Sequence, residues 1–289
     1  MSTHIIEEIR AALHAGRAIP YLGAGVLELA GAECPVPATP LALVGRLTAK
    51  ASVPGKIRNN LTAAAQFIEN FKHRKTVSRA MTEAFGHAVP PTVLHDYLAT
   101  LPTLPLLVHA WYDDLPQRAL QASDERGDDW AMVQGVSQAE HFGNWVHWFA
   151  TDGARMDHMD RQDIPASAAT LLYQPLGSIA PAANFLVSDS DFVEVLTEID
   201  IQTPIPEAVQ QLRIDRHFLF LGCRFSTQLE RIFARQIMKR SSGRHWAVIP
   251  GELTRNERRF LEDQGIERVD LPLGEFVAQL MGDELAKAG

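Results

Sequence analysis

The stretch Ile19-Pro20-Tyr21-Leu22-Gly23-Ala24-Gly25-Val26 decides the fold of this chain. Its first four residues predict a short buried β-strand, and the Gly-Ala-Gly that follows predicts a tight turn. A turn of this kind lets the backbone come close to a phosphate and points N–H groups at it. The sequence therefore predicts that the chain opens with a nucleotide-binding strand and loop.

Further apolar runs follow this stretch, separated by segments with helical spacing. They predict strands at Leu104–Val108, Phe185–Val187, His217–Leu221, Trp246–Ile249 and Glu267–Leu271. Runs without alternation indicate a parallel sheet covered by helices on both faces. The sequence thus predicts an α/β protein with a Rossmann-like, doubly wound sheet of about six parallel strands, whose ligands bind beyond the carboxyl ends of the strands.

Two stretches interrupt this alternation. Residues 28–91 contain helical patterns and no strand pattern, and residues 123–167 are polar and then aromatic. We expect both to form a smaller, mainly helical module inserted into a single domain. The Rossmann-like part then covers approximately residues 1–27, 92–122 and 168–289. The alternation within the aromatic run His141–Phe149 indicates a strand with both faces partly covered. It is expected in the core of the module, with a protein-binding surface as the alternative.

Composition narrows the class of protein. The 289 residues carry a formal net charge of −8, which argues against nucleic acid as the main partner. The sequence contains no apolar run long enough to cross a bilayer and shows no signal-peptide pattern at its start. Cys34 and Cys223 lie far apart, so a disulfide framework is not expected. These features predict a cytoplasmic protein that does not bind membranes.

Four segments in order resemble the sirtuin-like family of NAD-consuming domains, especially its bacterial stand-alone branch. That family has a Gly-Ala-Gly-Val turn, a strand ending in Thr-x-Asn-x-Asp, a Leu-His-Gly-Ser turn and a strand ending in Gly-x-Ser-x-x-Asp. The corresponding stretches here are Gly23–Val26, His109–Leu115, Pro175–Pro181 and Phe218–Thr227.

The resemblance implies a cleft for NAD or an ADP-ribose derivative. In it, Gly23, Ala24 and Gly25 would contact the pyrophosphate, and Asp113 would lie near a ribose. The third turn would contribute Gly177 and Ser178, and the fourth would bring Gly222 and Ser226 near the phosphate or the adenosine ribose. No structural zinc is expected, because many sirtuins use four cysteines for it and two isolated cysteines cannot supply them.

The catalytic residue types of the family are replaced. Trp111 stands at the position of the asparagine, and Leu176 stands at the position of the histidine that acts as general base. Leucine accepts no proton, and an indole N–H only donates. Losing a general base costs about 10²- to 10⁴-fold in rate. Leu27 also replaces the serine that normally follows the first turn.

The main hypothesis is therefore a catalytically degenerate sirtuin-like domain. It would act as an accessory or regulatory protein through a retained nucleotide cleft, through protein binding, or both. One alternative is an active NAD hydrolase, as in relatives associated with phage defence, with His109 or a water network in place of the missing base. Another is a pure protein-interaction module in which Leu27, Trp111 and Leu176 fill the cleft.

Overall fold

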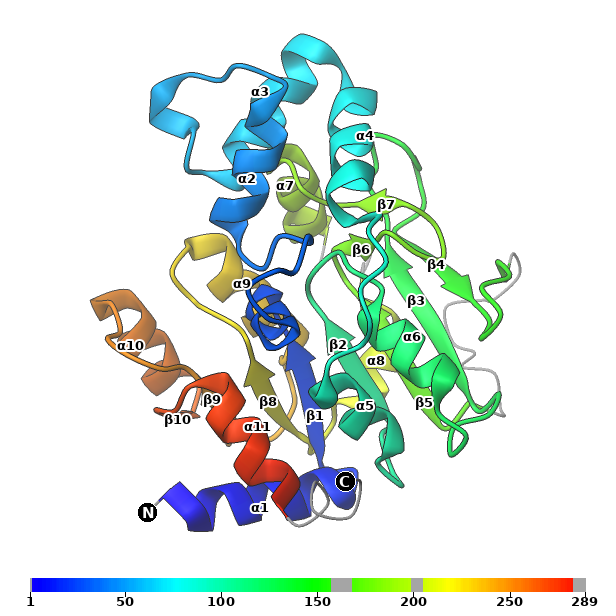
Figure 1. Ribbon diagram of the computed structural model, residues 1–289, viewed down its shortest axis with the longest axis vertical. Helices are drawn as coiled ribbons and strands as arrows, with labels where there is room; N and C mark the ends of the chain where they lie inside the picture. The colour runs from blue at the N-terminus through cyan, green and yellow to red at the C-terminus, as the bar shows by residue number, and fades with distance from the viewer. Residues whose placement is uncertain (1, 157–167, 199–204, 283–289) are drawn as a thin grey trace.

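The computed structural model describes residues 2–156, 168–198 and 205–282, and an eight-stranded sheet lies at its centre (Figure 1). The strand order is β10-β9-β8-β1-β2-β5-β3-β4, and every neighbouring pair is parallel except β3 with β4. The strands are β1 Ala18–Leu22, β2 Leu106–His109, β3 Trp130–Gly135, β4 Val146–Phe149, β5 Thr170–Gln174, β8 His217–Leu221, β9 His245–Val248 and β10 Ile266–Val269.

The central strands are buried on both faces. In β8, Phe218 and Phe220 join one apolar cluster, and Leu219 and Leu221 join the other. Successive side chains of a strand point to opposite faces, so both faces of this strand need apolar residues. This explains why His217–Leu221 reads as a continuous apolar run.

Helices cover both faces of the sheet, which confirms the predicted Rossmann-like α/β fold. One face carries α1 Ser2–His14, α5 Val93–Thr100, α6 Leu115–Ala122 and α11 Leu273–Met281. The other carries α7 Asp189–Glu198, α8 Glu207–Leu212, α9 Gln228–Ile237 and α10 Arg255–Asp263. Helices α9 and α10 each begin with a capping box, in which a threonine and a glutamate satisfy each other's backbone N–H groups.

A helical layer lies beyond the carboxyl ends of β1 and β8 (Figure 1). It consists of α2 Pro40–Ala49, α3 Leu61–Lys72 and α4 Arg74–Phe85, with 3₁₀ turns η1 Ala24–Ala30 and η2 Gly55–Ile57. Residues 28–91, all of them described, thus contain helices and no strand, as the sequence predicts. The exact boundaries of the module remain a prediction.

The structure corrects the second part of the expected module. Residues 123–167 were expected to belong to a mainly helical inserted module, but Trp130–Gly135 and Val146–Phe149 are strands of the sheet itself. The aromatic run His141–Phe149 therefore contributes an antiparallel edge strand, not the core of a helical module. Residues 157–167 lie outside the described residues.

Two strand predictions also differ from the structure. The sheet contains β5, which the sequence did not predict, and it has eight strands where about six were expected. Of the predicted strand Phe185–Val187, only Phe185 is in a strand. It belongs to β7 Asn184–Phe185, which pairs with β6 Gly177–Ser178 in a separate two-stranded sheet. Phe185, Leu186 and Val187 are apolar because they belong to the buried core, a role that local sequence cannot separate from a sheet strand.

Among the described helices, none is both long and apolar enough to cross a membrane.

Candidate functional site

The candidate site lies where the turns after β1 and β8 meet. The Gly23 N–H donates to the Leu221 carbonyl at 2.9 Å, and the Gly25 N–H donates to the Gly222 carbonyl at 2.9 Å. A Cβ atom on Gly25 would lie 2.9 Å from the Gly222 oxygen. Glycine is therefore needed at position 25, because the backbone of the first turn lies directly against the backbone of the turn after β8. Two of the N–H groups expected to face a phosphate are thus bonded within the protein.

Gly222 completes this contact from the other side. Its φ of +63° is in the left-handed region, and a Cβ on it would lie 2.3 Å from the Val26 nitrogen. Ala24, between the two glycines of the first turn, is half-buried and packs against the core. The two turns thus form one interlocked unit.

The apolar side chains that stand in place of the family's polar residues all belong to one core cluster. Leu27, Trp111 and Leu176 are 2, 4 and 8 % exposed, and they share a cluster with the helices of the 28–91 layer. The indole Nε1 of Trp111 donates to the Pro37 carbonyl at 2.9 Å. The indole ring also contacts Phe85 and Tyr112, with centroid distances of 5.9 and 5.0 Å. Trp111 therefore points into the core beneath the helical layer.

His109 forms a buried pair with Asp113. Its Nε2 lies 3.2 Å from the Asp113 carboxylate and 3.1 Å from the Asp113 carbonyl, and the histidine is only 1 % exposed. The other carboxylate oxygen of Asp113 accepts the Leu115 N–H at the start of α6. Burial alone would raise the pKa of Asp113, but the charge and hydrogen bond of His109 lower it overall.

The third and fourth motif turns are also bonded internally. The Ser178 hydroxyl is fully buried and donates to the Asp113 carbonyl at 2.9 Å. Gly177 has a φ of +77°, and a Cβ there would lie 2.1 Å from the Asn184 oxygen. Ser226 is exposed, and its hydroxyl donates to Glu230 at 3.1 Å.

Counting from Gly222 corrects one motif assignment. In Gly-x-Ser-x-x-Asp the serine falls at Arg224, not at Ser226, and the aspartate falls at Thr227. Arg224 pairs with the buried Glu257 at 2.9 Å, which fastens this turn to the start of α10. Thr227 caps α9. Both positions therefore have structural roles in this chain.

Several of the groups that the resemblance assigns to an NAD or ADP-ribose ligand are thus engaged within the protein in this arrangement. A pyrophosphate needs N–H donors, and those of Gly23 and Gly25 are bonded to carbonyls. A ribose needs an accessible acceptor, and the Asp113 carboxylate is buried against His109 and Leu115. Apolar side chains, those of Leu27, Trp111 and Leu176, stand where polar family residues are expected.

The two cysteines on which the expectation about structural zinc rests, Cys34 and Cys223, are both free thiols. Across residues 2–156, 168–198 and 205–282, no group of three or more His, Cys, Asp or Glu side chains is arranged to hold a metal ion.

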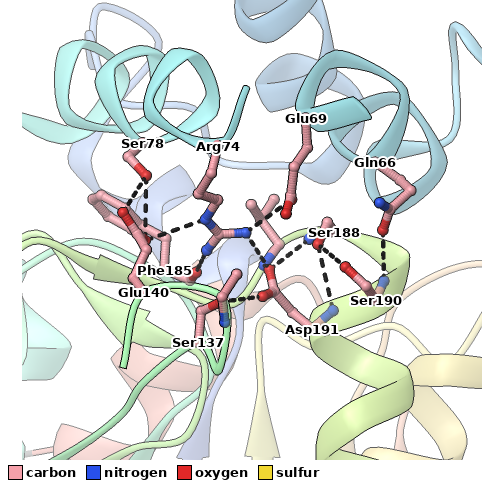
Figure 2. A network of polar contacts seen from close by, with 12 residues as sticks. Gln66, Glu69, Arg74, Ser78, Ser137, Glu140, Phe185, Ser188, Ser190 and Asp191 are labelled. Carbon is pink, nitrogen blue, oxygen red and sulfur yellow. Dashed lines mark hydrogen bonds and ion pairs between the residues drawn. The ribbon is translucent and has the colours of Figure 1, made fainter. Parts of the chain in front are cut away.

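A second polar cluster, centred on Arg74, was not predicted from the sequence (Figure 2). The guanidinium of Arg74 bonds to Asp191 at 2.7 Å, to Glu69 at 3.2 Å and to Glu140 at 3.1 Å, and it also donates to the Phe185 carbonyl. Burial alone would lower the pKa of Arg74, but the carboxylate of Asp191, followed by Glu140 and Glu69, raises it overall.

Asp191 is the buried centre of this cluster. Its carboxylate also accepts the N–H groups of Val187 and Ser188 at 2.8 and 3.0 Å and the Ser137 hydroxyl at 2.5 Å. The cluster joins α4 to the start of α7 and to the β3–β4 connection. The Ser188-x-x-Asp191 spacing could have signalled a helix start, but no local pattern pairs Asp191 with a residue 117 positions away.

Comparison with known proteins identifies the family to which the chain is similar. A family model described as a SIR2-like domain matches residues 105–269, which include β2 to β10 and three of the four motif turns. No curated protein matches the chain.

Proposed function

The chain belongs to the SIR2-like family, which is related to NAD, and we propose that it is a catalytically degenerate member that acts as an accessory or regulatory protein. It acts through protein binding and not through a retained nucleotide cleft. The proposed role is that of a stable scaffold which recognises another protein.

The observation that carries this proposal is the identity and burial of the side chains at positions 111 and 176. Both hold apolar side chains where the family resemblance places an asparagine and a general-base histidine. Both are buried in the core, and Trp111 is held there by its hydrogen bond to Pro37. An enzyme without a general base and without its positioning residue retains little turnover.

The hydrolase alternative receives less support. In one form of it His109 acts as the base, but Nε2 of His109 is engaged by Asp113 and the side chain is 1 % exposed. In the other form a water network replaces the base. A general base must reach the proton that it removes, directly or through one water. The buried pair supports a structural role for His109 at the start of α6.

Proton NMR spectra of NAD mixed with the purified protein over several hours test this proposal. We expect sharp, unchanged NAD signals and no free nicotinamide. Nicotinamide that accumulates, and no longer does so with the His109→Ala variant, would overturn the proposal in favour of the hydrolase. Broadened NAD signals without nicotinamide would keep the loss of catalysis but restore the nucleotide cleft as the means of action.

A further inference from the structure

A groove of about 240 Å³ is lined by residues of α9 and α10 and by Gln264, which follows α10. Ile232 and Phe260 contribute apolar surface to it. Phe260 is largely buried against the core, so the base of the groove is anchored to the fold. None of its lining residues belongs to the four motif turns, so the groove is separate from the candidate nucleotide site.

The groove is positively charged, although the whole chain is acidic. Three guanidinium groups, those of Arg231, Arg235 and Arg259, line it with a single carboxylate, that of Asp263. The chain as a whole carries a formal net charge of −8. A local excess of positive charge on an acidic protein attracts an acidic partner to one place and repels it elsewhere.

The arginines are placed to bind a ligand from two sides. Arg231 and Arg235 lie one turn apart on α9, and Arg259 belongs to α10. Nη1 of Arg231 donates to the Phe225 and Ser226 carbonyls at 2.6 and 2.9 Å, which fixes its guanidinium at the groove. Arg259 forms a 3.4 Å ion pair with Asp263, and both side chains are exposed, so this pair is easily exchanged for another carboxylate.

The uncharged lining fits the same chemistry. The amide side chains of Gln228, Asn256 and Gln264 also line the groove and can donate hydrogen bonds. Arginine binds carboxylates through two parallel hydrogen bonds, and it is enriched among the residues that dominate protein interfaces. The apolar surface of Ile232 and Phe260 can receive an aliphatic side chain beside the carboxylates.

We propose that the α9–α10 groove binds a short acidic segment of a partner protein. This inference rests on the proposed accessory role and names the chemistry of its partner. A nucleic acid fits less well, because its recognition needs an extended basic surface, and here three arginines are confined to one groove on an acidic protein.

A labelled peptide, Glu-Glu-Leu-Glu-Glu-Leu, tests the proposal by fluorescence anisotropy with the full chain. The titration is made at about 20 mM NaCl, where charges act over about 20 Å, and repeated at higher salt. We expect saturable binding that weakens with salt. In the double variant Arg235→Glu/Arg259→Glu, we expect about tenfold or greater loss of affinity.

The double variant Arg58→Glu/Arg79→Glu is the matched control, because it makes the same change in net charge at two exposed arginines of the helical layer. We expect it to keep the affinity of the unchanged protein, and thermal unfolding of both variants checks their folding. Equal loss in both variants, no binding at low salt, or tighter binding of an oligothymidylate of equal charge would overturn the proposal. Because the NAD measurement does not involve this groove, nicotinamide release with peptide binding intact would overturn only the accessory role.

Discussion

At position 111, a tryptophan occupies the connection between β2 and α6, and its indole is held by Pro37, Phe85 and Tyr112. We predict that Trp111→Asn, which restores the residue type of the family, destabilises the protein by about 3–5 kcal/mol, because it removes a large buried side chain. Urea unfolding measures this loss. Trp111→Phe keeps most of the packing, so it should cost clearly less. Nicotinamide release by a stable Asn variant would contradict the structural role assigned to Trp111.

The buried side chain of His95, on α5, makes the stability of the protein depend on pH. Burial lowers its pKa from 6.5 to about 4, and the charged groups that face it are Asp113 and His109. The unfolded chain therefore binds a proton between pH 6.5 and 4 that the folded protein does not bind. Stability must fall as the pH falls through this window, by up to about 3 kcal/mol from this one group.

Urea unfolding of His95→Gln at pH 7.5 and pH 4.5 checks this expectation. The variant should lose a smaller share of its stability between the two pH values than the unchanged protein does. His87→Gln, at an exposed histidine, serves as the control and should show the full loss. An unchanged pH dependence in His95→Gln would assign the acid sensitivity to other buried groups, such as His245, whose pKa burial also lowers to about 4.

At the scale of elements, the turns after β1 and β8 hold each other in place. We predict that Gly222→Ala destabilises the protein by about 3 kcal/mol, because it adds left-handed strain to a clash with the Val26 backbone. Gly251→Ala is a matched control: its φ is also positive, at +76°, but a Cβ there meets nothing within 4 Å. The free energies of unfolding measured in urea should separate the two variants by about 2 kcal/mol. Equal effects would mean that the two turns can shift to accommodate the added Cβ at little cost in free energy.

At the scale of the whole molecule, the Arg74 cluster fastens the helical layer to the sheet (Figure 2). We predict that Arg74→Met destabilises the protein by about 3–5 kcal/mol, because it leaves the Asp191 carboxylate buried without its charge partner. Chemical denaturation provides the measurement. Lys50→Met removes an exposed pair with Glu83 and should change stability little. Similar effects of both variants would show that the layer does not depend on Arg74.

Much of the architecture could be predicted from short-range patterns. Apolar runs such as His217–Leu221 indicate strands buried on both faces, and Thr-x-x-Glu spacings mark the starts of α9 and α10. Strands β3 and β5 were harder to predict than β4, because the polar residues Gln134 and Gln174 interrupt their aliphatic pattern. Their membership of the sheet depends on pairing with distant strands, which a local pattern does not encode.

The sequence by itself determined which chemical groups this protein can use. It places no general base at Leu176 and no amide at Trp111, and it supplies glycines where two turns need them. Only the tertiary structure decided what these residues contact: Trp111 is turned into the core, the N–H groups of Gly23 and Gly25 bond to the β8 turn, and Arg74 meets Asp191. The physical reason is that residue types set what a group can donate or accept, whereas long-range packing sets which partner it meets.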